Sequence, residues 1–409
     1  MMFFSNKTTA CPFCYREFNI NKVAFQCSGA GKPGRPRCER QADPRRSEHF
    51  GDQTPVMPTI VARNMGVPIR GNNGQLVDVL GKKHVECTSC GATTGIRLCP
   101  HCHSRLPRSL DANSPMFGLV GVRNSGKTVF LSVLHETLKK KISRRFNASI
   151  DTPGGANGYA RSLEQFRSVM DNQSELPNQT SKRGNKHAEP AIYDWKYQDS
   201  KGHHRSTVFS FYDSAGEDLA DLQDFESQQY LKSANGLILL LDPFAFPHNQ
   251  NAAKSKGINA ADASSAEYTS PETVMSNLTE VLRAAHAVKS TKKIKIPIAI
   301  AVSKIDAFFD EIPQQSPIRR QAPESNVFDE QDSLDVHEHM IALIQKWGGD
   351  NLVRKVEQEF ETFRFFGVSA LGAEPNYQSG AMNDRGLLPH RVADPLLWLM
   401  ANRDFIPST

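Results

Sequence analysis

A short apolar segment that runs into a glycine-rich turn and then a helical pattern is the strongest constraint on how this chain folds. Residues 116–121 are apolar, and residues 127–141 carry apolar side chains at helical spacing. The turn between them (GVRNSGKT) fits G-x-x-x-x-G-K-[ST]. Such glycines let backbone N–H groups surround phosphate oxygens at the positive end of the helix. The pattern therefore predicts a nucleotide site in which Lys127 reaches the β- and γ-phosphates and Thr128 binds Mg²⁺. The other predicted contacts of the turn are Gly121, Asn124, Ser125 and Gly126.

Apolar strands alternate with helical patterns through the rest of the chain. The predicted strands are 116–121, 191–197, 207–213, 236–242, 296–303 and 363–369. Helices are expected over 270–288 and from Asp394 onward, where Ser270 and Asp394 each precede a proline that favours a helix start. Near-continuous apolar strands with helices between them predict an α/β fold with a doubly wound, mostly parallel sheet. Two polar stretches, near 246–269 and 311–332, are expected to be loop insertions.

Cysteine and charge divide the chain near residue 110. All eight cysteines lie at or before Cys102. Residues 1–110 carry 16 Lys+Arg and 7 Asp+Glu, a net charge of +9, whereas the remainder carries 33 and 37, a net charge of −4. No apolar run reaches the roughly 18 residues of a membrane span, and residues 1–7 lack the charged and apolar regions of a signal peptide. We therefore expect a cytoplasmic protein with an α/β domain over 111–409, in which paired cysteines favour metal over disulfides.

Two closely spaced C-x2-C pairs predict one metal site. Cys87, Cys90, Cys99 and Cys102 match the spacing of a closed, structural four-thiolate zinc site. Gly91 suits the tight turn after the second cysteine. This site would belong to a zinc-ribbon unit over 51–110, with His101 and His103 exposed to solvent.

The remaining cysteines predict a second zinc site. Cys11, Cys14, Cys27 and Cys38 would form it within a first zinc-binding unit over 1–50. Two alternatives stay open: Cys27 or Cys38 is free, or the four cysteine pairs interleave. Redox chemistry at the C-x2-C pairs is disfavoured because no βαβ pattern of the thioredoxin type surrounds them.

Polar residues at three predicted strand ends bear on which nucleotide binds. Asp306, at the end of strand 296–303, can accept two hydrogen bonds from N1 and N2 of guanine, and the stem of Lys304 can lie over the base beside Ser303. Ser369 and Ala370 follow another strand, where a backbone N–H could meet guanine O6. Asp213 could bind near Mg²⁺, and the N–H of Gly216 could touch the γ-phosphate.

These motifs resemble those of TRAFAC-class P-loop GTPases. Residues 121–128 match the first motif, 213–216 the D-x-x-G motif, 303–306 the [N/T]-K-x-D motif and 369–370 the S-A motif. Ser303 departs from the usual Asn or Thr. More narrowly, CPFC, CPHC, FYDSAGEDL, LLLDP, SKIDA, FFGVSALG and PHRVADPLLWL together resemble the bacterial double-GTPase type 2 family, which bears N-terminal zinc ribbons. The resemblance implies GTP and GDP as ligands and a role in predicted conflict systems with a co-encoded GTPase or effector.

The groups that would support hydrolysis are less regular. Glu217 stands where Ras-like enzymes carry a Gln that orients water, so it could hold a water, or it could face solvent or cap a helix. Asn124 matches the P-loop of potassium-stimulated members of the class, where K⁺ neutralises transition-state charge. Thr180 is the preferred switch I threonine and Thr152 the second choice, with a plain loop threonine as the alternative.

The sequence predicts a GTP-binding switch that hydrolyses GTP slowly and docks a protein partner. A GTP sensor without hydrolysis, an RNA- or ribosome-associated GTPase and an ATPase are the alternatives. Eight zinc-bound thiolates and two Zn²⁺ would lower the charge of the basic module by about 4, so nucleic acid is a disfavoured partner.

Overall fold

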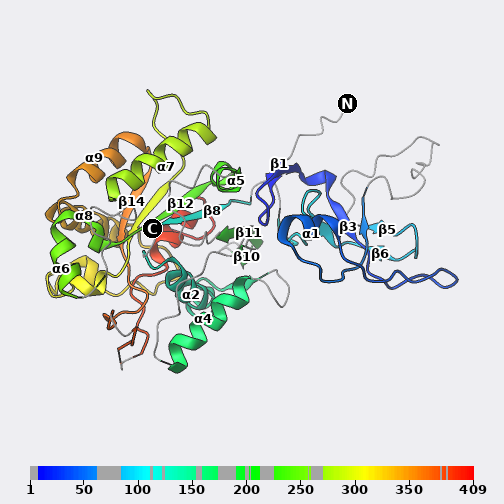
Figure 1. Cartoon of the computed structure of the whole chain (residues 1–409), viewed down its shortest axis with the longest axis horizontal. Coiled ribbons are helices and arrows are strands. Elements are labelled where there is room, and N and C mark those ends of the chain that lie inside the picture. Colours follow the sequence, from blue (N-terminus) through cyan, green and yellow to red (C-terminus); the bar gives the residue numbers. More distant parts are fainter. Residues whose placement is uncertain are drawn as a thin grey trace.

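The computed structural model describes residues 8–61, 84–110, 114–121, 125–152, 159–173, 190–198, 202, 204–211, 225–256, 258, 270–377, 380–383 and 386–409. A cysteine-rich module lies beside a larger α/β domain (Figure 1). Within the described residues, no helix is long and apolar enough to cross a bilayer.

A parallel sheet of four strands forms the centre of the α/β domain, in the order β14-β13-β12-β8. Its strands are β8 (Phe117–Gly121), β12 (Gly236–Leu241), β13 (Ile298–Val302) and β14 (Phe363–Gly367). Leu240 pairs with Gly121, and Val302 pairs with both Leu241 and Gly367. The four strands therefore end at one edge of the sheet, and the predicted strands 116–121, 236–242, 296–303 and 363–369 are confirmed.

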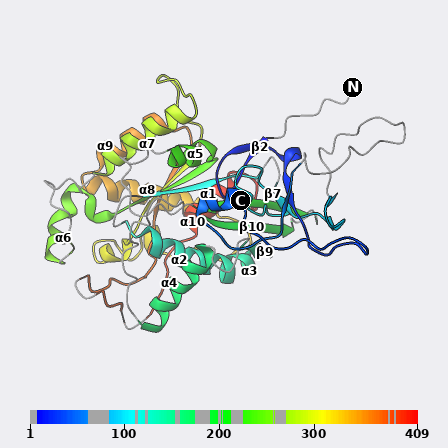
Figure 2. The same cartoon turned by 45° about the vertical axis from the view of Figure 1, so that its right-hand side comes forward.

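Helices cover both faces of this sheet, and β12 is therefore buried on both sides. Leu237 and Leu239 face one apolar cluster, which includes α5, α7, α8 and α9, whereas Ile238 and Leu240 face another, which includes α2 and α10. Figure 2 shows the helices on opposite sides of the strands. The fold is α/β and doubly wound, as predicted. The helices are α2 (Lys127–Thr137), α5 (Phe225–Ser233), α7 (Pro271–Ala285), α8 (Glu330–Lys346), α9 (Asp350–Glu359) and α10 (Asp394–Ala401).

Local sequence accounts for the ends of the predicted helices. Ser270 caps α7 by accepting a hydrogen bond from the N–H of Thr273 at 3.2 Å, with Pro271 at the first helical position. The α-helical part of the predicted helix 127–141 stops at Thr137, and a π-helical turn over Leu138–Ile142 continues it into α3 (Ser143–Arg145). The first residue of the predicted insertion 246–269, Phe246, is fully buried against Trp347. A short helix, α6 (Gln250–Ser255), follows it.

A second sheet is antiparallel and has the order β11-β10-β9. It contains β9 (Ala148–Asp151), β10 (Ala191–Gln198) and β11 (His204–Phe211). The long helix α4 (Tyr159–Gln173) lies between β9 and β10 in the chain, and its Leu163 belongs to the same apolar cluster as α2. Strands 191–197 and 207–213 are thus broadly confirmed, although β11 ends at Phe211 in the described residues. Strand β9 and helix α4 were not predicted from the sequence.

The cysteine-rich module has little regular structure. It contains β1 (Thr8–Ala10), β2 (Glu17–Asn19), β3 (Ala24–Gln26), α1 (Pro44–Phe50), β4 (Thr59–Ile60), β5 (Val85–Glu86), β6 (Thr93–Thr94) and β7 (Arg97–Leu98). Strand β3 lies between β4 and β7 in a three-stranded antiparallel sheet. Seven of the nineteen buried residues in the apolar cluster of this module are cysteines, which fits a module that needs cross-links to fold. The proposed boundaries at residues 50 and 110 stay predictions.

Two tyrosines join the module to the strand that enters the glycine-rich turn. The Tyr15 ring packs edge-on against the Tyr230 ring of α5, with centroids 4.8 Å apart, and both rings are buried. The N–H of Leu119 in β8 donates to the Tyr230 hydroxyl oxygen at 2.5 Å. Within the described residues β8 and β11 belong to separate sheets, so Tyr230 satisfies a backbone donor of β8 on the side away from β12.

We expect Tyr230→Phe to lower the free energy of unfolding by about 1–3 kcal/mol, because the buried N–H of Leu119 would lose its acceptor. Urea unfolding measures this change. Tyr197→Phe is the matched control: its hydroxyl donates to the carbonyl of exposed Asp404, which water can reach, so the cost should stay below about 1 kcal/mol. An equal loss of unfolding free energy in the two variants would contradict the role of Tyr230 as the acceptor for the N–H of Leu119.

Candidate functional site

The glycine-rich turn begins at the end of β8 and leads into α2. Gly126 has φ = +79°, a conformation that glycine adopts without strain. A Cβ at Gly121 would lie 2.8 Å from Ser125 Oγ and 3.0 Å from the Leu240 carbonyl oxygen, so only glycine fits there. Lys127 is buried and its Nζ donates to the Gly121 carbonyl oxygen at 2.9 Å. The structure thus brings Gly121 and residues 125–128 together at the N-terminus of α2.

A second group of polar residues lies at the end of β13. The backbone N–H and the hydroxyl of Ser303 both donate to the Leu241 carbonyl oxygen, at 2.9 and 3.0 Å. Lys304 has φ = +51°, in the left-handed region that side-chain-bearing residues rarely adopt. Its Nζ forms an ion pair with Asp242 Oδ2 at 2.7 Å. Such local strain is most often retained at functional sites.

Asp306 and Ser369 meet across the ends of β13 and β14. The N–H of Ile305 donates to the Val368 carbonyl oxygen at 3.2 Å, and the Ser369 side chain lies close enough to the Asp306 carboxylate to lower its pKa. Ser369 Oγ also accepts from the N–H of Gly372 at 2.7 Å. Burial raises the pKa of Asp306 above its usual value, although the Ser369 side chain opposes the rise. A buried carboxylate of this kind would gain strongly from two further N–H donors.

The predicted site residues therefore fall into two sets. Gly121, Ser125, Gly126, Lys127 and Thr128 form the turn, and the sheet edge that they share also carries Ser303, Lys304, Asp306, Ser369 and Ala370. Thr152 directly follows β9 and is half-buried. Outside the described residues lie Asn124, Thr180, Asp213, Gly216 and Glu217. The roles of both sets toward a nucleotide stay predictions.

Three residues near Asp306 were not assigned by sequence reasoning. Asp242, at the end of β12, accepts from the N–H of Phe244 at 3.0 Å and pairs with Lys304. The Phe244 ring lies 5.9 Å from Lys304 Nζ and packs edge-on against Tyr377, with centroids 6.0 Å apart. The sequence signal for Asp242 is an Asp-Pro pair directly after an entirely apolar strand. Tyr377 has no comparable sequence signal, because its loop is far from Asp242 and Asp306 in the sequence.

The cysteines form two compact groups whose pairing differs from the one preferred above. The first cluster is Cys11, Cys14, Cys99 and Cys102, and the second cluster is Cys27, Cys38, Cys87 and Cys90. In each cluster the four sulfurs lie within 4.8 Å of one another. The grouping of Cys87 and Cys90 with Cys99 and Cys102 is therefore wrong, and the alternative in which the pairs interleave is confirmed.

The antiparallel pairing of β3 with β7 explains the interleaving. Ala24 pairs with Leu98 and Phe25 with Arg97, so Cys27 and Cys99 follow their strands at opposite ends of the ladder. Each cysteine therefore joins the cluster at its own end. Sequence spacing could not reveal this, because the ladder joins segments about 70 residues apart.

The chemistry of each cluster fits a tetrahedral metal ion. Four sulfurs at 2.3 Å from a central Zn²⁺ would be about 3.8 Å apart. The Sγ–Sγ distances are 3.9 Å for Cys11–Cys102 and 3.8 Å for Cys14–Cys99 in the first cluster. In the second cluster they are 3.4 Å for Cys27–Cys90 and 3.8 Å for Cys38–Cys87. Burial raises the pKa of Cys38 to about 11, so a cation would be needed to hold such thiols as thiolates.

Three C-x2-C turns share one backbone geometry. The residue after the second cysteine has a positive φ in each: +57° at Tyr15, +70° at Gly91 and +55° at His103. The N–H of that residue donates to the carbonyl oxygen of the first cysteine, at 2.8, 2.8 and 3.0 Å respectively. The turn thus points both thiols of a pair toward the same centre, as predicted for Gly91, and in the other two turns a non-glycine residue adopts it.

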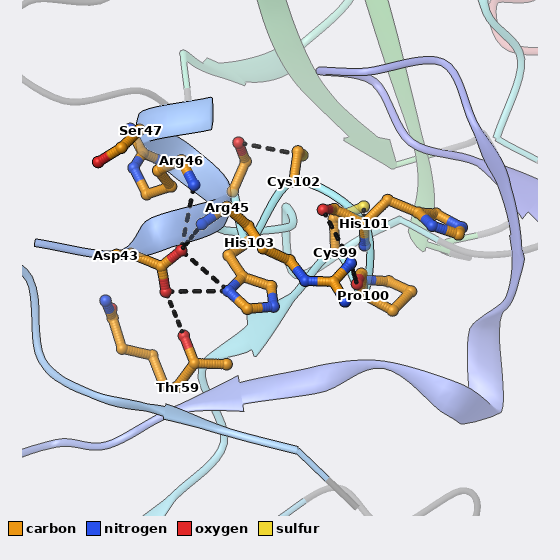
Figure 3. A network of polar contacts seen from close by, with 12 residues as sticks. Asp43, Arg45, Arg46, Ser47, Thr59, Cys99, Pro100, His101, Cys102 and His103 are labelled. Carbon is orange, nitrogen blue, oxygen red and sulfur yellow. Dashed lines mark hydrogen bonds and ion pairs between the residues drawn. The ribbon is translucent and has the colours of Figure 1, made fainter. Parts of the chain in front are cut away.

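A polar network supports the turn that ends at His103 (Figure 3). His103 Nδ1 lies 2.9 Å from Asp43 Oδ2, and Thr59 Oγ1 donates to the same oxygen at 2.9 Å. Asp43 also caps α1 by accepting from the N–H groups of Arg45 and Arg46. Burial disfavours the ionised carboxyl, but the hydrogen bonds from His103, Arg46 and Thr59 outweigh it and lower the pKa of Asp43.

The predicted exposure of His103 is wrong, because its side chain is only 10% exposed. The histidine contacts Asp43 rather than a metal and fixes the loop that carries Cys102. His101 is partly exposed, and its Nε2 lies 3.2 Å from the Glu17 carbonyl oxygen.

Comparisons with known proteins agree with the motifs on this edge. The Double-GTPase 2 family model matches residues 115–373. Among curated proteins, no sequence matches the chain. Among solved structures, the signal recognition particle receptor SRb-GTP/SRX complex from Chaetomium thermophilum is 12% identical, with a TM-score of 0.27, and the match covers 64% of this chain and 93% of that one.

Two further solved structures are similar at the same low level. The S. cerevisiae Ski7 GTPase-like domain bound to GTP is 15% identical, with a TM-score of 0.31, over 73% of this chain and 52% of its own. Bacterial selenocysteine-specific elongation factor EF-Sec is 15% identical, with a TM-score of 0.24, over 71% and 29%. The match thus spans about half of the Ski7 domain and less than a third of the elongation factor. Because the family model covers well over half of its 409 residues, the chain belongs to the Double-GTPase 2 family.

Proposed function

We propose that the chain is a GTP-binding switch that hydrolyses GTP slowly. The observation that carries this proposal is that Asp306 and Ser369, which follow the neighbouring strands β13 and β14, lie on the sheet edge that also carries the glycine-rich turn. Strand β13 is two strands away from β8, about 10 Å at the usual spacing between strands. Phosphates at the turn and a base at Asp306 would thus be two ends of one nucleotide lying along this edge.

The turn supplies groups of the right chemistry for the phosphates. The backbone N–H groups at the start of α2 are suited to bind an anion, and Lys127 would exchange the Gly121 carbonyl oxygen for a phosphate oxygen. The Thr128 hydroxyl, with Asp213, would hold Mg²⁺, which would neutralise charge on the phosphates when bound. Glu217 would orient the attacking water, and Asn124 would help bind K⁺. These last assignments, like that of Thr180 to switch I, rest on the sequence.

The switch is proposed to act in the cytoplasm with a protein partner, a co-encoded GTPase or an effector of a bacterial conflict system. This part rests on the resemblance and on the family match.

We expect Asp306→Asn to weaken GTP binding about ten- to a hundredfold and to favour xanthine nucleotide. The amide can no longer accept both the N1 and N2 hydrogens of guanine, and its own N–H can donate to the O2 of xanthine. Titration with fluorescent GTP and xanthosine triphosphate measures the shift. Asp310→Asn, a nearby exposed carboxylate, is the control and should leave both affinities unchanged. Unchanged GTP affinity in Asp306→Asn would overturn the guanine assignment.

Phosphate release from GTP should be slow, below about 10⁻² s⁻¹ without a partner, as in related switches. Lys127→Ala should abolish it, whereas Lys140→Ala, at an exposed position beyond α2, should not. Release should be faster in potassium than in sodium buffer; equal rates would remove the cation role of Asn124. GTP binding with no release over hours would contradict the hydrolytic step.

We further propose that each cysteine cluster holds one structural Zn²⁺, on the strength of its donor set and sulfur spacing. The wild type should then contain two zinc ions per chain by elemental analysis. Cys14→Ser/Cys99→Ser changes the first cluster alone and should keep one zinc. Cys90→Ser/Cys99→Ser changes both clusters and should keep none. One zinc retained in the latter variant would contradict the interleaved pairing.

A further inference from the structure

Two loops meet across the end of β13, where Asp306 lies. Because β13 has β12 on one side and β14 on the other, the loops after these two neighbouring strands flank it. The loop after β12 contains a 3₁₀ turn over Pro243–Ala245 and then α6, and it reaches Lys256. The loop after β14 contains Ser369 and reaches Tyr377.

The two loops contact each other directly in two places. Lys256 Nζ lies 2.7 and 2.6 Å from the two carboxylate oxygens of Glu374, an ion pair in which one ammonium bridges both oxygens. The side chains are 33% and 30% exposed, so water screens this pair only in part. The second contact is the edge-on packing of Phe244 against Tyr377. We call the four side chains of these contacts the clasp.

The clasp lies close to the groups assigned to the base. The Phe244 ring is 5.9 Å from Lys304 Nζ, and Phe244 also packs against Phe308, two residues after Asp306, with ring centroids 5.2 Å apart. Burial raises the pKa of Tyr377, and the negative charges of Glu374 and Asp306 add to the rise, so these groups lie near one another. The clasp thus closes one side of the space in which a base bound to Asp306 would lie.

We propose that Lys256 and Glu374 are positioning residues that hold the two loops around a bound guanine base and so slow the release of the nucleotide. The inference rests on the proposed function, because it takes Asp306 as the base contact. The loop that carries Glu374 also carries Ser369, and it begins at Val368, whose carbonyl oxygen accepts from the N–H of Ile305 next to Asp306. The ion pair therefore restrains the base site from the α6 side. When the pair is broken, the loops can separate without first giving up a charge-assisted contact.

Release of fluorescent GDP from the full-length chain, chased with excess unlabelled GDP, tests the proposal. Lys256→Glu and Glu374→Lys should each speed release about fivefold, because like charges would then face each other. Lys256→Gln, which removes the charge without repulsion, should speed it about twofold. The exchange Lys256→Glu/Glu374→Lys should return release to within about twofold of the wild type, which loss of folding stability alone would not do. Lys254→Glu, an exposed charge reversal on the same helix, is the matched control and should leave release unchanged.

The outcomes separate the two claims. Unchanged release in both single reversals, or failure of the exchange to restore it, overturns the clasp while the proposed function stands. Failure of the wild type to bind GDP, or equal GTP affinity in Asp306→Asn, overturns the proposed function, and the clasp as a base-retaining device falls with it. Thermal unfolding of each variant distinguishes a local change at the clasp from loss of the fold.

Discussion

The parallel hydrogen bonding of β8, β12, β13 and β14 is the constraint on which the rest of the α/β domain depends. It satisfies the backbone of four strands that are almost wholly buried, so helices must cover both faces. It also brings the carboxyl ends of all four strands to one edge. Polar groups that have no place within the sheet gather there, and Gly121, Asp242, Ser303 and Ser369 all lie at strand ends on this edge.

Much of this sheet could be predicted because a parallel strand has an unambiguous pattern. The strand from 236 onward is apolar at every position, and α7, the helix before β13, begins with a serine cap and a proline. Strand β9 gave no such signal, since its four residues alternate between half-buried and exposed. The residues of the glycine-rich turn could likewise be located from spacing alone, because the turn is a local structure.

Contacts between distant segments could not be predicted from spacing. The cysteine pairing depended on a ladder between β3 and β7, and local spacing favoured the wrong partners. Asp242 and Tyr377 lie near Asp306 because β12 and β14 are the two neighbours of β13, and spacing in the sequence does not give that order. His103 differs from a surface histidine only through Asp43, sixty residues earlier. In each case the missing information was which distant segments are neighbours, rather than which residue types are present.

A short series of contacts links the cysteine-rich module to the glycine-rich turn. Tyr15 directly follows Cys14, and its left-handed turn points the thiols of Cys11 and Cys14 toward the centre of the first cluster. Its ring packs against Tyr230, whose hydroxyl oxygen accepts the N–H of Leu119 two residues before Gly121. Loss of order in the first cluster would remove a buried packing partner of Tyr230 and expose a backbone donor of β8. The strand that enters the turn is therefore linked, through Tyr230, to the residue that follows Cys14, more than a hundred residues earlier in the chain.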